Sequence, residues 1–300
     1  MSRLETTFMD TLLKNPVVVA SGTYGYGEEY VDYYNPALLG GVCSKGITRY
    51  PKLGNDGIRL WETPSGLLNS IGLENPGIET FIEKHLKKMN LLNTAVIVNV
   101  GGNTIDEYLE SVELLNDCNI DFIELNISCP NVKVGGMAFG IKAKSAAKVV
   151  SKVTNISKHK IMVKLSPNAE NIVEMAKACE DNGADGLSLV NTFQGMAIDI
   201  HKKKAAFDNL YAGLSGPAIK PIALRMVHQV YKNVNIPIMG LGGISTWQDA
   251  LEFIMAGATA IQIGTANFIN PMTPIEIIRG LEEYCVKNDV ESVGELVGIV

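Results

Sequence analysis

Eight short runs of apolar residues constrain the fold of this chain most strongly, because each is followed by a polar or glycine-containing turn and then by a stretch with helical spacing. The runs begin at Pro16, Gly41, Thr94, Asp121, Lys160, Gly186, Ile236 and Ala260. Strands that are apolar along their whole length and alternate with helices indicate a parallel sheet buried on both faces. Eight such units are typical of a closed (β/α)8 TIM barrel, which is the predicted fold. An open doubly wound sheet is the alternative.

The spacing of these runs also predicts the domain organisation. The chain has 300 residues, and α/β barrels of this length commonly form one unit, so we expect a single domain over residues 1–300. Two connections, near residues 49–93 and 193–235, are longer than the others, and long insertions usually build the substrate side of a barrel. The stretch LWETPSGLLNSIGLENPG is too rich in glycine, proline and asparagine to form one helix. The prediction is therefore a barrel with inserted loops over its carboxyl-terminal face.

Charge and cysteine content argue against several classes of function. The formal net charge of -6 gives no general attraction to nucleic acid or anionic membranes. No apolar run reaches the length of a membrane span, and the amino terminus lacks the apolar core of a secretory signal. We therefore expect a cytoplasmic protein that binds neither nucleic acid nor membrane. Its five cysteines are widely spaced without a C-x-x-C pair, so the sequence predicts neither a metal site nor a redox disulfide.

The carboxyl ends of the strands carry the candidate site residues, because barrel active sites are assembled there. In chain order they are Ser21-Gly22, Lys45-Gly46, Asn99, Asn126 with Ser128-Cys129, Lys164, Asn191-Thr192, Gly242-Gly243 and Gly264-Thr265. No strand ends in histidine and no two carboxylates converge. This pattern argues against metal hydrolysis, glycosidase chemistry and a histidine-activated nucleophile. For Cys129 alone, a packed thiol at a strand end is the simpler interpretation, since free cysteine is usually buried.

Two lysines and two glycine turns among these residues favour a phosphorylated cofactor. Lysine is seldom buried, so Lys45 and Lys164 need anionic partners or must reach water along their stems. The turns after strands seven and eight lie where barrels usually bind phosphate, and the amides of Gly243, Gly264 and Thr265 can donate to it. Flavin mononucleotide (FMN) fits this arrangement, because a fixed ammonium such as that of Lys164 would stabilise the negative charge of the reduced ring. Tight turns and capped strand exits remain the simpler alternatives.

Seven motifs occur together across nearly the whole chain. They are KGIT at 45–48, NSIGLENPG at 69–77, NISCPNVKVGGMAFG at 126–140, VKLSPN at 163–168, VNT at 190–192, GLGGI at 240–244 and IGTA at 263–266. In combination they resemble the dihydroorotate dehydrogenases of pyrimidine biosynthesis. In that family a cysteine in the SCPN loop marks the soluble class 1 enzymes, whereas the membrane-associated class 2 enzymes have serine and an amino-terminal extension that this sequence does not show. The continuation VKVGGMAFG is similar to class 1B, the NAD-linked branch, more than to the fumarate-using class 1A.

The resemblance implies two sets of binding residues. FMN would contact Ser21, Lys45, Gly46, Asn99, Asn126, Lys164, Val190, Gly216, Gly242, Gly243, Gly264 and Thr265. Dihydroorotate or orotate would contact Lys45, Asn69, Ser70, Ile71, Gly72, Leu73, Asn126, Asn191 and Thr192. Most of these positions are also selected by the strand ends. Gly216 and the stretch from 69 to 73 come from the resemblance alone.

The resemblance also implies a reaction in which (S)-dihydroorotate loses a proton from C5 and a hydride from C6 to give orotate. FMN N5 would accept the hydride, and Cys129 would be the general base on the opposite face of the substrate. A free thiol has a pKa of about 8.5, so activity should rise with pH through the thiol titration. Gly135 and Gly136 would let the loop of Cys129 open and close over the substrate. Lys45 would balance the substrate carboxylate.

Partners follow from the same resemblance. Class 1B enzymes pair with a subunit that carries FAD and a 2Fe-2S cluster and passes electrons to NAD, so we expect a homodimer extended to a heterotetramer. This sequence has no cysteine cluster for an iron-sulfur centre and no G-x-G-x-x-G after a strand. Alternatives are a class 1A enzyme and another FMN barrel that acts on dihydropyrimidines, or on dihydrouridine in tRNA, which the charge disfavours. A phosphate-binding barrel without catalysis is the rival from a different class.

Overall fold

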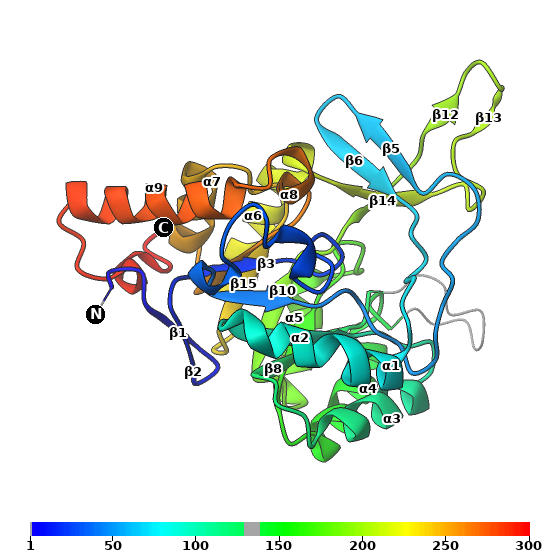
Figure 1. Ribbon diagram of the computed structural model, residues 1–300, viewed down its shortest axis with the longest axis horizontal. Coiled ribbons are helices and arrows are strands. Elements are labelled where there is room, and N and C mark those ends of the chain that lie inside the picture. Colours follow the sequence, from blue (N-terminus) through cyan, green and yellow to red (C-terminus); the bar gives the residue numbers. More distant parts are fainter. Residues whose placement is uncertain (1, 129–138) are drawn as a thin grey trace.

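The computed structural model of the protein describes residues 2–128 and 139–300, and a closed barrel of eight parallel strands lies at its centre (Figure 1). The strands are β3 (Val17–Val19), β4 (Gly41–Cys43), β7 (Ala95–Val100), β8 (Phe122–Asn126), β9 (Lys160–Lys164), β10 (Gly186–Leu189), β15 (Ile238–Leu241) and β16 (Ala260–Ile263). Neighbours in the barrel follow chain order, and pairing of β16 with β3 closes it. Each of the eight predicted strands is present. The TIM barrel is confirmed, and the open sheet was wrong.

Helices between the strands pack on the outside of the barrel. The longer ones are α3 (Ile105–Leu115), α4 (Ala143–Ile156), α5 (Ile172–Asp181), α6 (Lys220–Tyr231), α7 (Trp247–Met255) and α9 (Thr273–Lys287). Shorter turns of helix are η1 (Glu28–Tyr30), η2 (Pro36–Leu38), α1 (Ile78–Thr80), η3 (Phe81–Leu86), α2 (Lys87–Met89), η4 (Asn90–Leu92), η5 (Pro217–Ile219), α8 (Ala266–Ile269) and η6 (Val293–Leu296). Within the described residues, no helix is long and apolar enough to cross a membrane.

Local sequence signals set the helix ends. Helix α3 begins after Thr104, whose hydroxyl accepts a hydrogen bond from the amide of Glu107. Helix α5 begins after Asn171, and its side chain caps two amides of the first turn. Gly183 follows the end of α5 and has a φ of +92°. Left-handed backbone at that position favours glycine, which ends the helix.

The alternation of side chains along each strand divides the core in two. Outward residues pack under the helices, and inward residues fill the barrel. A hairpin of β1 (Thr6–Phe8) and β2 (Thr11–Leu13) places Phe8 and Leu13 in the inner cluster with Phe122 and Met162, and all four side chains are fully buried. Because this hairpin packs against the lower layer of the barrel, the amino-terminal end is filled with apolar side chains. The carboxyl-terminal end remains for polar groups.

The two long insertions meet in one antiparallel sheet. Its strands, in order, are β11 (Phe193–Gly195), β14 (Ala212–Ser215), β6 (Gly66–Asn69) and β5 (Leu60–Thr63). A further hairpin, β12 (Ile198–Asp199) with β13 (Lys204–Ala205), extends beyond this sheet, on the side of the molecule away from both chain termini (Figure 1). The predicted loops are therefore structured, and the first insertion forms strands in the stretch that the sequence analysis had excluded as a single helix.

Candidate active site at the barrel mouth

A buried ion pair lies inside the barrel, below its carboxyl-terminal mouth. Nζ of Lys164 stands 3.3 Å from Oε2 of Glu124, and the two side chains are 5% and 0% exposed. Lys164 is the last residue of β9, and Glu124 is the third residue of the neighbouring strand β8. The anionic partner that the buried lysine required is therefore Glu124. Glu124 is not among the residues predicted from the strand ends.

The Glu124 cluster comprises this carboxylate and the polar side chains that contact it from five other strands. Its members are Asn99 at 2.5 Å and Lys164 at 3.3 Å from Oε2, Ser188 at 2.8 Å and Gln262 at 2.9 Å from Oε1, and the Cys43 thiol at 3.4 Å from Oε2. Burial alone raises the pKa of Glu124, but the charge of Lys164 and the three neutral donors outweigh it. The pKa of Glu124 therefore lies below its ordinary value, and the side chain is a carboxylate.

One predicted asparagine, Asn99, belongs to this cluster, and a second, Asn126, stands beside it. Nδ2 of Asn126 lies 3.4 Å from Oδ1 of Asn99, and the Asn126 carbonyl accepts a hydrogen bond from the Tyr108 hydroxyl at 2.7 Å. Asn99 is fully buried, inside β7 rather than at its end as predicted. The amide of Ser128 donates to Oδ1 of Asn126 at 3.2 Å. Asn99, Asn126 and Lys164 are thus brought together as expected.

The glycine turns after β15 and β16 are adjacent to the second insertion. Gly242 and Gly243 have φ of +126° and +81°, and a Cβ at Gly243 would stand 2.8 Å from the Gly216 carbonyl oxygen. Oγ1 of Thr265 donates to the hydroxyl of Ser215 at 2.8 Å. The residues predicted to hold phosphate therefore converge, and Gly216, which the resemblance alone supplied, is among them.

Open space remains beside these turns. A Cβ built on Gly264 would meet only Ala20 Cβ, at 3.8 Å, and one on Gly22 would meet nothing within 4 Å. Gly46 differs, because a Cβ there would approach Oδ1 of Asn99 to 3.0 Å. Glycine at these positions leaves the backbone accessible to a ligand at the mouth of the barrel.

Asp249 fixes the turn that follows β15. Its Oδ2 accepts hydrogen bonds from the amides of Ser245 and Thr246 at 3.0 and 2.9 Å, and its Oδ1 lies 2.6 Å from Nζ of Lys220. Burial raises the pKa of Asp249, but Lys220 and these donors lower it by more, so the group is a carboxylate. Since the backbone amide of Lys220 lies beside Gly243, this ion pair holds the glycine turn against α6.

The stretch from Asn69 to Leu73 leaves the sheet of the two insertions. Nδ2 of Asn69 donates to the carbonyl of Gly213 at 3.1 Å, and the buried Ser70 hydroxyl accepts from Asn55 at 3.0 Å. Gly72 and Leu73 both have positive φ, so Ile71 to Leu73 turn sharply rather than continuing the strand. This path is held by described neighbours on both insertions.

Lys45 is partly exposed at the barrel mouth. It follows the end of β4, its side chain is 30% exposed, and its ammonium lies 4.0 Å from Oε2 of Glu74. That separation is at the limit of an ion pair, and Glu74 is itself 48% exposed. Lys45 therefore retains a weakly paired charge at the rim, in contrast to Lys164.

The loop after β10 carries the remaining predicted residues. Val190 is buried, and its amide donates to the Leu241 carbonyl at 2.9 Å. Oδ1 of Asn191 accepts from the amide of Thr192 at 2.8 Å, and the Thr192 carbonyl accepts from Asn168 at 3.1 Å. No described contact joins the side chain of Asn191 to those of Asn99 and Asn126. Of the three strand-end asparagines, the described contacts therefore join two, Asn99 and Asn126.

Cys129, the predicted base, lies outside the described residues, as do Gly135 and Gly136. The described chain reaches it through Ser128, whose hydroxyl donates to the Lys164 carbonyl at 3.2 Å. The other four cysteines are free thiols, and Cys43, Cys179 and Cys285 are buried. Burial raises the pKa of Cys179 to about 12. Neither Cys43 nor Cys179 is a source of thiolate at neutral pH, because burial raises the pKa of Cys43 as well.

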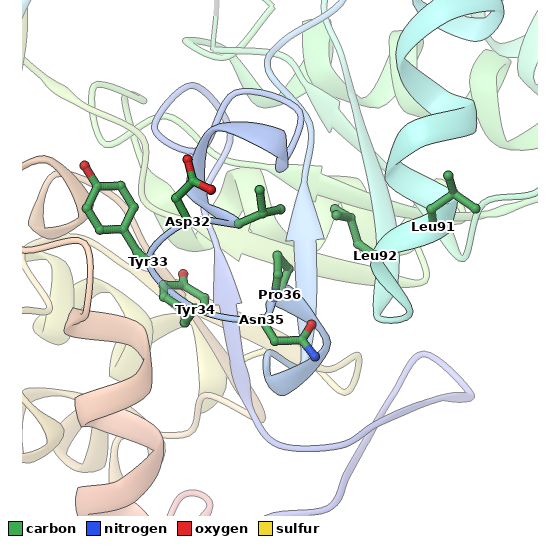
Figure 2. Close-up of a pocket in the computed structure, with 8 residues that line it drawn as sticks. Asp32, Tyr33, Tyr34, Asn35, Pro36, Leu91 and Leu92 are labelled. Atoms are coloured by element: carbon green, nitrogen blue, oxygen red, sulfur yellow. The ribbon is translucent and has the colours of Figure 1, made fainter.

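A separate surface hollow of about 370 Å³ lies between residues 31–36 and Leu91–Leu92 (Figure 2). It contains none of the strand-end residues. Leu91 within it is 83% exposed, and the figure shows side chains around its edge rather than convergent polar groups. We assign the chemistry to the barrel mouth, where charged and amide groups from several strands meet.

Sequence reasoning missed the interior members of the Glu124 cluster. Glu124, Ser188 and Gln262 lie in the middle of apolar runs, whereas the predicted site residues are all expected at or beyond strand ends or in the loops. A signal was available, since a carboxylate inside a buried strand requires partners of its own. The partner of Lys164 could have been sought among such interior polar residues.

Comparison with known proteins agrees with this geometry. The model of the family described as dihydroorotate dehydrogenase matches residues 3–285. A protein of Petrotoga mobilis named dihydroorotate dehydrogenase B (NAD(+)), catalytic subunit, is 58% identical over 96% of both chains. Proteins with the same name from Thermoanaerobacter pseudethanolicus and Bacteroides thetaiotaomicron are 51% and 49% identical, over 95% and 99% of both chains respectively.

Proposed function

The chain belongs to the dihydroorotate dehydrogenase family, and from that premise we propose that it oxidises (S)-dihydroorotate to orotate in the synthesis of UMP, as the catalytic subunit of an NAD-linked enzyme. The observation that carries this proposal is the 58% identity to a catalytic subunit of that name over 96% of both chains. The barrel mouth supports it independently, through a buried ammonium, paired amides and glycine turns in one region.

The residues at the mouth fit FMN. A phosphate needs accessible backbone amides, and the space beside Gly264 provides access without steric obstruction. The convergence of Gly216, Gly243 and Thr265 supports a phosphate position there. When bound, FMN supplies the acceptor for the hydride that leaves C6 of the substrate.

The chain's own groups orient the cofactor. Lys164 would present a fixed positive charge to the polar edge of the flavin ring, and Asn99 and Asn126 would donate hydrogen bonds beside it. Ser21, Lys45, Gly46, Val190 and Gly242 complete the proposed FMN contacts. Because Lys164 is held in the barrel interior and not on a loop, its charge is positioned before the ligand arrives.

Substrate binding is assigned to the rim. The weakly paired Lys45 would neutralise the carboxylate of dihydroorotate, and the stretch Asn69, Ser70, Ile71, Gly72 and Leu73 would enclose it from the first insertion. Asn126, Asn191 and Thr192 are assigned to its ring amides and carbonyls. These groups come from four separate parts of the chain. The second insertion supplies none of them but aligns the stretch from 69 to 73, because its strand β14 pairs with β6, so a correctly placed substrate needs both insertions in place.

Cys129 is the proposed general base. The chain leaves β8 at Asn126, and the Ser128 hydroxyl donates to the Lys164 carbonyl, so the last described residue before Cys129 lies next to a residue of the proposed flavin site. A thiolate of Cys129 would remove the C5 proton, and a closed loop would exclude water. Activity is therefore expected to rise with pH through the titration of this thiol.

A partner subunit completes the proposed electron path. The relatives' names identify them as catalytic subunits of NAD-linked enzymes, which supports a second subunit. We propose that this partner carries FAD and a 2Fe-2S cluster, and that two copies of each chain form a heterotetramer. A cytoplasmic location and a single domain over residues 1–300 also remain predictions.

One anaerobic experiment tests the function. The purified chain reconstituted with FMN should lose its visible flavin absorbance when dihydroorotate is added, and orotate should form in equal amount. Dihydrouracil, which lacks the carboxylate, serves as the control substrate and should leave the spectrum unchanged. A flavin that stays oxidised with dihydroorotate would contradict the proposed reaction. Fumarate and NAD, each with and without the partner subunit, then identify the acceptor; turnover with fumarate alone would contradict the NAD-linked assignment.

A further inference from the structure

Glu124 is the only carboxylate within ion-pair distance of Lys164 among the residues that the structure describes. Of the described ion pairs this one is the most deeply buried, with 5% and 0% of its two side chains exposed. The other described polar contact of the Lys164 ammonium is with a neutral oxygen, Oε1 of Gln262, at 3.4 Å. The Lys164 ammonium, which is proposed to face the flavin ring, thus has one described negative partner, Glu124 on the neighbouring strand β8.

The contacts within the cluster fix the orientation of the Glu124 carboxylate. Ser188 and Gln262 donate to Oε1, which leaves Oε2 directed toward Lys164 and Asn99. Gln262 also bridges the pair, since its Nε2 contacts Glu124 while its Oε1 faces the ammonium. The position of Lys164 is therefore determined by groups that need not touch the cofactor.

We propose that Glu124 is a positioning residue that keeps Lys164 charged and fixed at the place where it would meet the polar edge of the flavin. An ammonium taken out of water without a negative partner is strongly disfavoured and loses its proton instead. With glutamine in place of Glu124, Lys164 would face only neutral groups within the barrel. It would then become a neutral amine at neutral pH, and the site would lose the charge that favours the reduced flavin.

Few of the described titratable groups other than Lys164 lie close enough to Glu124 to affect the pH dependence expected for a Glu124 variant. Among the described residues, those facing Glu124 are Lys164 from β9 and Cys43 from β4, whereas β7, β10 and β16 contribute the neutral Asn99, Ser188 and Gln262. Burial, followed by the charge of Glu124, raises the pKa of the Cys43 thiol well above its ordinary value. Cys43 therefore stays protonated near neutral pH, and a new titration in a Glu124 variant belongs to Lys164.

The inference rests on the proposed function, and its test measures FMN binding and potential instead of turnover. The dissociation constant of FMN and the flavin midpoint potential are measured from about pH 6 to 9 for wild type, Glu124→Gln and Lys164→Met. In Glu124→Gln, FMN should bind about tenfold more weakly than in wild type at the alkaline end and recover to within about twofold at the acid end, as Lys164 regains its proton. Lys164→Met should show no such recovery.

A matched control separates charge from packing. Ser188→Ala removes one hydrogen bond from Oε1 of Glu124 but leaves the carboxylate, so the pH dependence of FMN binding should stay that of wild type. The double variant Glu124→Gln/Lys164→Met should match Lys164→Met, because Glu124 is argued to act through that lysine. A constant ratio between Glu124→Gln and wild type across the pH range would overturn the proposal.

Folding provides a second test if Glu124→Gln alone is unstable. An unpaired buried cation is then the cause, and the double variant, which has neither charge, should fold again. A double variant that is also unfolded would overturn the proposal, since Glu124 would then be required for packing. A wild-type chain that does not bind FMN would instead contradict the proposed function, so the two failures are distinguishable.

Discussion

Gly264→Ala separates cofactor binding from folding at the barrel mouth. Gly264 follows β16, and its φ lies outside the left-handed region, so alanine meets no backbone strain. The added Cβ would contact only Ala20 Cβ, at an ordinary 3.8 Å. We therefore expect the free energy of unfolding of the apoprotein to change by less than about 1 kcal/mol.

The same methyl group should weaken FMN binding considerably. It projects into the space that the proposed phosphate needs in order to approach the amides of Gly264 and Thr265. Displacing the phosphate would lengthen at least one hydrogen bond to a charged group, which contributes about 1.5–3 kcal/mol. The dissociation constant of FMN should therefore rise roughly 10- to 150-fold.

Two measurements on the same preparations check this prediction. Denaturant unfolding of the apoprotein gives the change in stability, and quenching of flavin fluorescence gives the dissociation constant. Gly294→Ala is the control, because this exposed glycine lies in η6, its Cβ would meet only the Ser292 hydroxyl at 3.4 Å, and it belongs to no proposed contact. An unchanged FMN affinity in Gly264→Ala would refute the placement of the phosphate.

Three other outcomes are expected. Cys129→Ser should fold and retain FMN but lose most orotate formation at neutral pH, since serine forms an alkoxide far less readily than cysteine a thiolate; near-normal turnover would rule out the base. Gly243→Ala should destabilise the apoprotein by about 2–4 kcal/mol in denaturant titrations, because a φ of +81° and backbone atoms at 2.8 Å oppose a Cβ; a loss below about 1 kcal/mol would contradict the local geometry. The folded pKa of Glu124 lies below the ordinary value of a glutamate, so the stability that this carboxylate adds is complete above that ordinary value and is lost as pH falls through the folded pKa. When the free energy of unfolding is measured at decreasing pH, it should therefore fall less steeply in Glu124→Gln than in wild type. Equal slopes for the two proteins would contradict the lowered pKa of Glu124.

The barrel was predictable because its signal is local. Each strand is a short apolar run bounded by a turn. Because the barrel strands are buried on both faces, they are apolar at almost every position and stand out clearly in the sequence. The candidate site residues at strand ends could be selected from the architecture, since parallel strands place those ends together. Lys164 illustrates the limit, because its need for an anion was evident while the identity of Glu124 depended on which strand lies next to β9.

The sheet of the two insertions was not predictable for a physical reason. Strand β5 alternates exposed and half-buried residues, and β6 is mostly half-buried. Their sequences, LWET and GLLN, nevertheless have neither a continuous apolar run nor an alternation of apolar and polar residues. The pairing of β6 with β14 joins segments more than 140 residues apart, between Asn69 and Gly213, and no local pattern specifies such a contact. Cys129 lies outside the described residues, so its role stays a prediction from the resemblance.

The register between β6 and β14 has a consequence for how the chain can vary in length. Gly213 pairs with Asn69 and Ser215 with Leu67, while Ser215 also bonds Thr265, so one ladder aligns the proposed substrate stretch with the proposed phosphate turn. A one-residue slip would turn every side chain of β6 to the opposite face. Insertions and deletions should therefore be tolerated at the tip of the β12–β13 hairpin, and be selected against within β6 and β14.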